Sequence, residues 1–332
     1  MTLLRLLGLS VIGFIAAGPA LGQSLAIPTY PTKPIRIVVP YAPGGSTDIV
    51  ARIIGEQMRQ SLGQPIVVES KIGANGIVAV EEMARSKDGY TLMVGNVTTN
   101  AITPVIDARK YKIDYGRDVV AVQRLVDVPH FILGTMTNFA PKTLPEVLEF
   151  ARKNPGKVRY GTVGVGSYPH YDTALLASRA GNLDMIAIHN KAGAAGEIND
   201  LITGDMQIAI VNVASSTAMV KAGKIRALAT INTVRLPEFP DAPTMTELGF
   251  PGVGTMAWQG LFASAATPKE ILDVLFKAST SALEQPAAKE LLAKQYYNIV
   301  PAKSLDDAKD WLGSEIALWR KTTSEIKIET AE

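Results

Sequence analysis

The order of strand, glycine-rich loop and helix occurs twice, and it is the feature that most constrains the fold of this chain. Residues 36–39 form a short apolar, β-branched run, and the prolines and glycines of residues 40–45 follow it. Ser46 then opens a segment whose apolar residues recur at helical spacing up to Gly63. The same order returns in residues 157–160, 161–167 and 168–180. This alternation predicts a parallel α/β sheet. Its repetition indicates two similar α/β domains, with chance similarity as the alternative.

The rest of the chain supports the same class of fold. We predict further strands at residues 65–69, 90–94, 185–188, 207–211, 225–230 and 258–263, from their short apolar runs. Helices are predicted at residues 77–85, 143–153 and 194–202, and in the stretch after residue 267. Residues 236–254 are rich in proline and glycine and are typical of a long irregular connection.

The N-terminus is typical of a secretory signal peptide. Arg5 precedes an apolar stretch, residues 6–17, that is short for a membrane span, and Ala20-Leu21-Gly22 fits a cleavage site. An uncleaved membrane anchor is the alternative. No later run is long and apolar enough to span a bilayer, so we expect a soluble exported protein. The chain contains no cysteine, and a bacterial periplasm is the expected location.

Composition and motifs exclude several classes of function. The formal net charge is only +2, which argues against nucleic acid as a partner. With no cysteine and three histidines that share no helical spacing, we expect no metal site. A nucleophile elbow, a phosphate loop and a dinucleotide fingerprint are all missing from the sequence. We therefore predict no catalytic residues and no cofactor.

Three glycine-rich loops at helix starts are the positive features. They lie at residues 43–47, 73–76 and 164–167. Backbone N–H groups at such a start can hold a carboxylate without an arginine or lysine, because the helix dipole favours negative charge there. Ligands of α/β sheets bind at the carboxyl ends of strands, where these loops lie. For each loop, the alternative is an ordinary turn whose serine caps its own helix.

Two polar residues near these loops could also reach a ligand. His170 follows the third loop within one helical turn, and Asn96 follows a predicted strand together with Thr98 and Asn100. A surface histidine and a solvated loop are the alternative interpretations.

A set of motifs, in order along nearly all of the chain after the leader, resembles one known family. The motifs are Tyr30-Pro31 with Lys33-Pro34-Ile35-Arg36; Val39-Pro40-Tyr41-Ala42-Pro43-Gly44-Gly45-Ser46-Thr47-Asp48; Val67-Val68-Glu69 with Gly73-Ala74-Asn75-Gly76; Pro155-Gly156-Lys157-Val158 with Tyr160-Gly161; Gly164, Gly166-Ser167 and His170; Ala222-Gly223-Lys224-Ile225-Arg226-Ala227-Leu228-Ala229; Pro240-Asp241-Ala242-Pro243-Thr244; and Trp258, Gly260-Leu261 and Thr267-Pro268. They are similar to those of the solute receptors of tripartite tricarboxylate transporters, which are bacterial periplasmic binding proteins.

The resemblance implies a two-domain α/β periplasmic binding protein of type II, a Venus flytrap, with a ligand cleft between the domains. The expected division is a signal peptide at residues 1–22, domain 1 at 23–124 plus 255–332, and domain 2 at 125–254. It also implies a carboxylate held mainly by backbone amides, hydroxyls and water. The predicted ligand-binding residues are Tyr41, Pro43, Gly44, Gly45, Ser46, Asp48, Ala74, Asn75, Asn96, Gly164, Gly166, Ser167, His170, Asn190 and Asn212.

Two departures from the family pattern concern the ligand. Relatives usually have Tyr-Lys-Gly where this chain has Asn190-Lys191-Ala192, which changes the expected shape of the cleft. Many have an acidic residue before an asparagine where this chain has Val211-Asn212. An acid there could pair with a ligand ammonium group, so we predict a carboxylate ligand without an amino group.

The sequence thus predicts a monomeric periplasmic receptor that captures a small carboxylate, most favourably a dicarboxylate. Its expected partners are that ligand and the membrane permease subunits of a tripartite transporter. A sensor that presents the ligand to a signalling protein is one alternative, and a secreted enzyme on the same fold is another. Linear dicarboxylates, citrate-like acids and aromatic acids such as terephthalate all remain open as ligands.

Overall fold

The computed structural model describes residues 30–73, 76–106, 112–190, 192–326 and 328. The chain divides into two compact units, residues 1–30 and 31–332, and every element below belongs to the second. The predicted signal peptide lies outside the described residues. Among the helices that are described, none combines the length and apolarity needed to cross a membrane.

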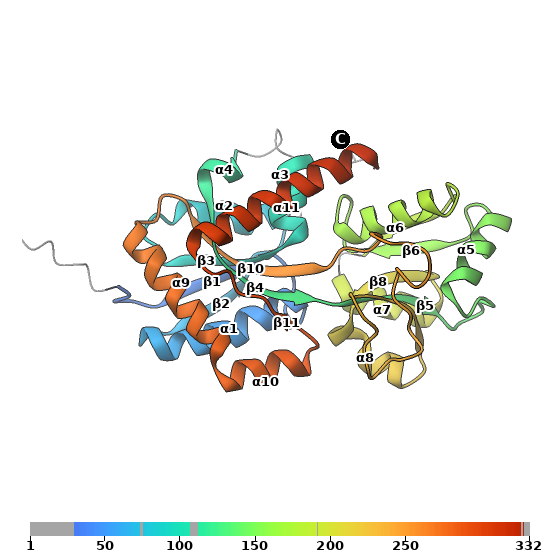
Figure 1. Ribbon diagram of the computed structural model, residues 1–332, viewed down its shortest axis with the longest axis horizontal. Helices are drawn as coiled ribbons and strands as arrows, with labels where there is room; N and C mark the ends of the chain where they lie inside the picture. The colour runs from blue at the N-terminus through green and yellow to red at the C-terminus, as the bar shows by residue number, and fades with distance from the viewer. Residues whose placement is uncertain (1–29, 74–75, 107–111, 191, 327, 329–332) are drawn as a thin grey trace, which may run out of the picture. The chain divides into compact units, whose positions relative to one another are not determined.

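The first sheet has six strands in the order β11-β4-β10-β3-β1-β2 (Figure 1). β1 is parallel to β2 and β3, whereas β10 is antiparallel to both β3 and β4, and β11 is antiparallel to β4. The strands are β1 (Ile35–Val39), β2 (Ile66–Ser70), β3 (Thr91–Asn96), β4 (Val119–Val128), β10 (Ala257–Ser264) and β11 (Asn298–Ile299).

Helices from both ends of the chain pack around this sheet. α1 places Val50, Ile54 and Met58 in the core with no exposed surface, which is the face its apolar spacing predicts. Trp258 of β10 donates its indole N–H to Glu315 of α11 at 2.8 Å, which fastens the last helix to the sheet. The helices are α1 (Ser46–Leu62), α2 (Ile77–Arg85), the π-helix η2 (Thr98–Ile102), α3 (Thr103–Ile106), α4 (Tyr115–Asp118), α9 (Lys269–Glu284), α10 (Pro286–Lys294) and α11 (Leu305–Glu325).

The second sheet has five strands in the order β7-β6-β8-β5-β9. β6 is parallel to β7 and β8, and β5 is antiparallel to β8 and β9. Its elements are β5 (His130–Thr135), α5 (Leu144–Lys153), β6 (Arg159–Thr162), α6 (Tyr168–Arg179), β7 (Ile186–His189), α7 (Gly193–Thr203), β8 (Ile208–Asn212), α8 (Val213–Lys221) and β9 (Ile225–Ile231).

A second hydrophobic core belongs to this sheet. Phe131 of β5 packs edge to face against Phe239, with ring centroids 5.0 Å apart. Leu201 and Met206 are fully buried in the same cluster. Phe239 lies in the irregular connection of residues 236–254, so this loop covers the core instead of leaving it exposed.

The prediction of a parallel sheet is correct only for the strand–helix–strand units. Both sheets are mixed, because β10 and β11 run opposite to the other strands of the first sheet and β5 runs opposite to the other strands of the second. Pro129 alone separates β4 of the first sheet from β5 of the second. The chain returns to the first sheet between β9 and β10. Neither β4 nor β5 was predicted, because Gln123, Arg124 and Asp127 interrupt the apolar residues of β4 and no turn sequence separates it from β5.

Candidate functional site

The first glycine-rich loop is held by Asp48, which lies in the first turn of α1. Gly44 has a φ of +84°, and its N–H donates to Asp48 Oδ2 at 3.0 Å. Asp48 is 3% exposed and also accepts from Arg52, whose nearest approach is 2.9 Å. This carboxylate raises the pKa of the Arg52 guanidinium. Asp48 therefore orders the loop that presents Gly45 and Ser46, the residues at the start of α1.

Tyr41 is fixed against the end of β3. Its hydroxyl donates to Asn96 Oδ1 at 3.0 Å and lies 3.0 Å from Thr99 Oγ1. The Thr99 N–H donates to the same Asn96 oxygen at 3.2 Å. Burial raises the pKa of Tyr41, so its hydroxyl keeps its proton at neutral pH. The structure thus brings two predicted site residues, Tyr41 and Asn96, into one hydrogen-bonded group.

Gln259 of β10 belongs to this group and was not predicted. Its Nε2 donates to Ser46 Oγ at 3.2 Å, and the side chain is 1% exposed. In the antiparallel register it lies opposite Asn96 of β3, so both side chains point to the same face of the sheet. One signal could have found it, since Gln259 is the only polar side chain in the strand predicted at residues 258–263.

The third glycine-rich loop is held differently. Ser167 is 1% exposed and donates its hydroxyl to Gly164 O at 2.8 Å. The N–H of Gly166 donates to His170 Nδ1 at 3.3 Å. The predicted residues of this loop are therefore together, and Ser167 and His170 bond to the loop itself.

A second histidine lies against His170. The ring of His189, at the end of β7, is 5.1 Å from that of His170, and its Nδ1 shares a hydrogen bond of 2.6 Å with Thr162. Burial lowers the pKa of His170 to about 4 and also lowers the pKa of His189. Both imidazoles are therefore neutral at neutral pH and offer hydrogen bonds without charge.

The start of α6 contacts the η2 segment of the first sheet. The N–H of Tyr168 donates to Thr98 Oγ1 at 3.3 Å. A Cβ added to Gly166 would lie 2.5 Å from Ile106 Cδ1, so this loop also closely approaches α3. Further along, Tyr171 of α6 meets Trp319 of α11 with ring centroids 5.7 Å apart. The η2 segment thus lies between Asn96 of the first loop's group and the N-terminus of α6.

Tyr168 also joins α6 to the connection between the sheets. His130 donates from Nδ1 to Val128 O at 2.7 Å, so its Nε2 accepts from the Tyr168 hydroxyl at 2.5 Å. Burial lowers the pKa of His130 to about 4, which keeps this arrangement of protons at neutral pH. The returning connection is fastened to the same helix, because Asp172 accepts from Thr255 N and Oγ1 at 2.8 Å each.

The other predicted site residues lie outside the two hydrogen-bonded groups described above. Asn190 donates to Asp200 at 2.6 Å and accepts from the N–H of Ala192, which places it at the start of α7. Asn212 caps α8 by accepting from Ser215 N at 2.9 Å. Pro43 lies exposed in the first loop. Ala74 and Asn75 lie outside the described residues.

Two positions bear on the charge of the ligand. Val211 is 2% exposed in the core of the second sheet, so packing accounts for its apolar side chain. Glu197 of α7 is buried, and desolvation together with Asp200 raises its pKa to about 8. Among the described residues, Arg52 is the basic side chain that lies at the first glycine-rich loop, and it forms an ion pair with Asp48. No group of three or more potential metal ligands is found among the residues that the structure describes.

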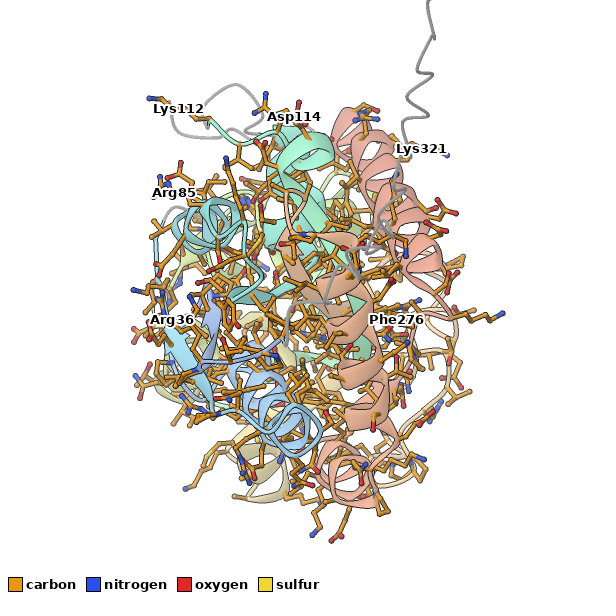
Figure 2. The ribbon with its side chains drawn as sticks, turned by 90° about the vertical axis from the view of Figure 1, so that its left-hand side faces the viewer. Arg36, Arg85, Lys112, Asp114, Phe276 and Lys321 are labelled. Carbon is orange, nitrogen blue, oxygen red and sulfur yellow. The ribbon has the colours of Figure 1, made fainter. Side chains whose placement is uncertain are left out.

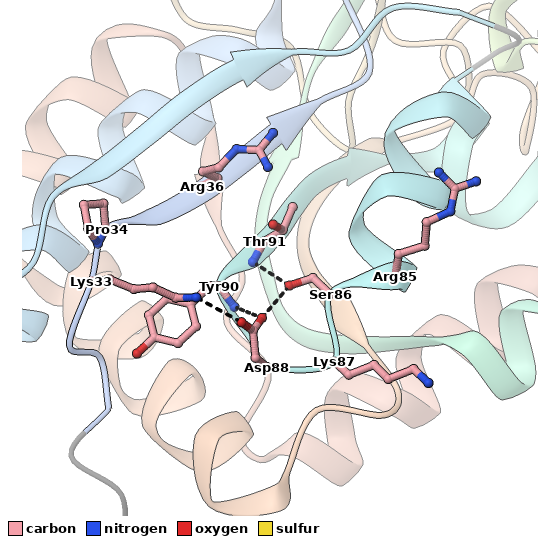
Figure 3. Close-up of a pocket in the computed structure, with 9 residues that line it drawn as sticks. All are labelled: Lys33, Pro34, Arg36, Arg85, Ser86, Lys87, Asp88, Tyr90 and Thr91. Carbon is pink, nitrogen blue, oxygen red and sulfur yellow. Dashed lines mark hydrogen bonds and ion pairs between the residues drawn. The ribbon is translucent and has the colours of Figure 1, made fainter.

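Two hollows on the surface lie away from these loops. The larger, about 620 Å³, is at the amino ends of β1 and β3 (Figure 3), whereas the first glycine-rich loop follows the carboxyl end of β1. Its Lys33 pairs with Asp88, and its Arg36 with Glu69 and Glu82. A smaller one, about 330 Å³, adjoins β9. Elsewhere the charges are dispersed, as Lys112 and Lys321 show on separate parts of the chain in Figure 2.

The two mixed sheets, joined by strands that pass from one to the other, define a two-domain α/β fold of the periplasmic binding protein class. Residues 50–326 match the model of the tripartite tricarboxylate transporter family receptor. The chain belongs to this family, and it is a solute receptor by that membership.

Individual relatives agree with this assignment. BugT of Bordetella pertussis is 31% identical over 326 residues, which are 96% of this chain and 98% of BugT. The solved structure of R. palustris Rpa4515 with adipate is 28% identical, with a TM-score of 0.82 over 90% of this chain and 99% of that one. MatC from Rhodopseudomonas palustris with bound malate is also 28% identical, with a TM-score of 0.79 over 88% and 99%.

Proposed function

We propose that this chain is a periplasmic receptor that captures a small dicarboxylate without an amino group and delivers it to the membrane subunits of a tripartite transporter. The observation that carries the proposal is that the loop before α1 and the N-terminus of α6 both contact η2. The Tyr41 hydroxyl of that loop lies 3.0 Å from Thr99 Oγ1, and Thr98 Oγ1 accepts from Tyr168 N.

A loop and a helix start that meet at one segment, each belonging to a glycine-rich unit, favour a ligand with two negative ends. The positive dipole at a helix start stabilises an anion by about 0.3–1 kcal/mol when exposed and up to ~2 kcal/mol when partly buried. At α6 the N–H groups of Gly166, Ser167 and Tyr168 bond within the protein, so the dipole is the contribution of this start. We assign one carboxylate to the start of α1, beside Ser46, and the other to the loop before α6. Closure around the ligand would exclude water and strengthen these contacts.

The surrounding charges favour a ligand without an ammonium group. A buried ammonium needs a carboxylate partner, because an unpaired buried charge is costly. Asp48 is already paired with Arg52, and the raised pKa of Glu197 keeps that carboxyl neutral at pH 7. Malate and adipate, bound by the two Rhodopseudomonas relatives, are dicarboxylates without an amino group.

The proposal includes the site and the domain division. The binding site would consist of the residues predicted from the sequence, which are Tyr41, Pro43, Gly44, Gly45, Ser46, Asp48, Ala74, Asn75, Asn96, Gly164, Gly166, Ser167, His170, Asn190 and Asn212. The two domains would be residues 23–124 with 255–332, and residues 125–254. We also propose that the receptor is a monomer and releases its ligand unchanged; sedimentation, and NMR of a ligand after incubation, test these two points.

The periplasmic location and the permease partner are parts of the same proposal. The leader at residues 1–22 would be removed on export, so the mass of the secreted protein should correspond to a chain that begins at Gln23. Binding to the permease subunits should depend on ligand, because the closed form would present the matching surface. A pull-down of those subunits with and without ligand tests this dependence.

The primary test is a thermal-shift screen of residues 23–332 against linear, citrate-like and aromatic carboxylates. A ligand that binds only the folded state stabilises it by ~2.7 kcal/mol at a hundredfold excess over its dissociation constant. We expect a large rise in melting temperature with dicarboxylates that have no amino group, and none with aspartate or glutamate. Mass spectrometry of the denatured protein first establishes that no copurified ligand fills the site. A ligand-free protein that no carboxylate stabilises would refute the proposal.

A further inference from the structure

Gln259 has a buried amide that the protein only half satisfies. Its Nε2 donates to Ser46 Oγ at 3.2 Å, but its Oε1 is buried and has no hydrogen-bond partner among the described residues. A buried carbonyl oxygen without a donor is unfavourable, and such atoms are uncommon in native proteins.

A second buried glutamine of the same sheet shows what full satisfaction looks like. Gln123 of β4 has no exposed surface. Its Nε2 donates to Thr280 Oγ1 at 2.8 Å, and its Oε1 accepts from Ala302 N at 2.7 Å. The protein therefore supplies both partners of the amide of Gln123 and only one partner of the amide of Gln259.

Neighbouring donors of the first loop's group are already engaged. The Tyr41 hydroxyl and the Thr99 N–H both donate to Asn96 Oδ1. The Gly44 N–H donates to Asp48. Ser46 receives the Gln259 amide on its oxygen, which leaves its own hydroxyl hydrogen for a ligand. The start of α1 thus combines donors that suit a carboxylate with one adjacent acceptor that lacks a donor.

We propose that Gln259 selects a 2-hydroxy carboxylate, with the carboxylate at Ser46 and the 2-hydroxyl donating to Gln259 Oε1. The two amide atoms of Gln259 share one carbon, so a ligand group on Oε1 lies next to a group on Ser46, as the hydroxyl and carboxylate of a 2-hydroxy acid do. This inference rests on the proposed function and names its ligand class.

The chemistry separates the hydroxyl from its alternatives. The unsubstituted diacid has only hydrogen at carbon 2 and cannot donate to Gln259 Oε1. The 2-oxo acid has an acceptor there, and two acceptor oxygens repel each other. An ammonium group can donate, but it is a charge for which Asp48 is not free. Sites built to bind a ligand hydroxyl discriminate strongly against analogues that lack it.

The experiment is calorimetry of residues 23–332 with three matched ligand sets of four, five and six carbons. Each set contains the unsubstituted diacid, both enantiomers of its 2-hydroxy acid, and its 2-oxo acid; the four-carbon set is succinate, malate and oxaloacetate. At the chain length that binds, we expect one enantiomer of the hydroxy acid to bind about tenfold more tightly than the parent diacid. The oxo acid should bind more weakly than the parent.

Variants locate the effect. Gln259→Leu, with Gln259→Met as a second variant, should bring the hydroxy acid and the parent diacid to within about twofold. The matched control Gln123→Leu should lower thermal stability and keep the tenfold preference. Equal binding of parent and hydroxy acid by the wild-type protein, preference for the oxo acid, or a preference that persists without Gln259 would each overturn the inference. Those results leave the dicarboxylate receptor standing, whereas failure of every diacid to bind overturns both.

Discussion

The units β1–loop–α1 and β6–loop–α6 share the same order of strand, glycine-rich loop, serine and helix, yet their serines face different partners. In the first, Asp48 holds the loop through Gly44 N, and Ser46 meets Gln259 from a distant strand. In the second, His170 holds the loop through Gly166 N, and Ser167 bonds back to Gly164 O. A contact with a distant strand leaves the Ser46 hydroxyl hydrogen for a ligand, whereas a bond within its own loop engages that of Ser167.

The two loops also differ in what surrounds their glycines. Gly44 has open space around the position of a Cβ, whereas Gly166 approaches Ile106 of α3. Both have positive φ, +84° and +75°. The first loop is thus free on its outer side, and the second is packed against the helix that follows η2.

The largest expected difference concerns these glycines. Gly44→Ala should cost about 1 kcal/mol of unfolding free energy, because an L-residue is strained at positive φ. Gly166→Ala carries the same strain and must also shift the terminal methyl of Ile106, so we expect a somewhat greater cost, about 1–2 kcal/mol, and weaker diacid binding. Urea unfolding and calorimetry of both variants measure this. Equal costs for the two would show that the contact with Ile106 is unimportant.

Acid should affect the second loop through His170. Its pKa of about 4 in the folded state lies below the usual 6.5, so the unfolded chain binds more protons between these values. The contribution of His170 to stability should therefore fall by about 1–2 kcal/mol as pH decreases from 6.5 to 4, after allowance for solvent screening. The raised pKa values of the buried carboxyls Asp172 and Glu197 act in the opposite direction, so the comparison with a variant isolates His170.

His170→Asn, which keeps an acceptor for Gly166 N, should reduce this acid sensitivity. Part of the effect should remain, because His130 has a similarly lowered pKa. Unfolding midpoints at several pH values compare the variant with the wild type. An unchanged slope between pH 4 and 6.5 would contradict the burial of a neutral His170.

The two serines should differ in their effect on binding. Ser46→Ala should weaken diacid binding about tenfold, because its hydroxyl hydrogen is assigned to the ligand. It should also lower the unfolding free energy by about 1 kcal/mol, because it removes the acceptor of the buried Gln259 amide. Ser167→Ala should lower the unfolding free energy by about 1 kcal/mol, since it removes the bond to Gly164 O. Calorimetry and thermal unfolding of the two proteins give both quantities. If Ser167→Ala weakened binding and Ser46→Ala did not, the ligand contact would belong to Ser167 and not to Ser46.

The smallest expected effect belongs to Asp48. Asp48→Asn keeps the size of the side chain and weakens its bonds to Gly44 N and Arg52. We expect a loss of about 1 kcal/mol in stability and a few-fold loss in affinity, through a less ordered loop. The control Asp88→Asn alters the ion pair with Lys33 in the hollow of Figure 3 and should leave affinity unchanged. A loss of affinity much greater than that of Ser46→Ala would indicate direct contact between Asp48 and the ligand.

The sequence predicted the local units well because their signals are local. The helix predicted at residues 77–85 is confirmed as α2, and α6 ends one residue before the predicted end. The glycine-rich loops follow strands β1 and β6 as expected. β4 and β5 were missed because polar residues interrupt the apolar residues of β4 and only Pro129 separates the two strands.

The site depends on pairs of residues that are far apart in the sequence, which no local pattern reveals. Gln259 and Ser46 are separated by 213 positions, and Tyr168 and Thr98 by 70. Asn190 and Asn212 were predicted as ligand residues, and the structure places each at the start of the helix that follows it. Their contact with a ligand stays a prediction, as does that of Ala74 and Asn75.

The central claim is that the starts of α1 and α6 each hold one carboxylate of the same ligand. Calorimetry of residues 23–332 with the best-bound diacid and with its monoamide of equal length tests it most directly. We predict that the monoamide, which lacks one charged end, binds at least tenfold more weakly than the diacid. In Ser46→Ala, the affinities of the diacid and of the monoamide that lacks the charge at α1 should lie closer together. A monoamide that binds as tightly as the diacid would contradict the account.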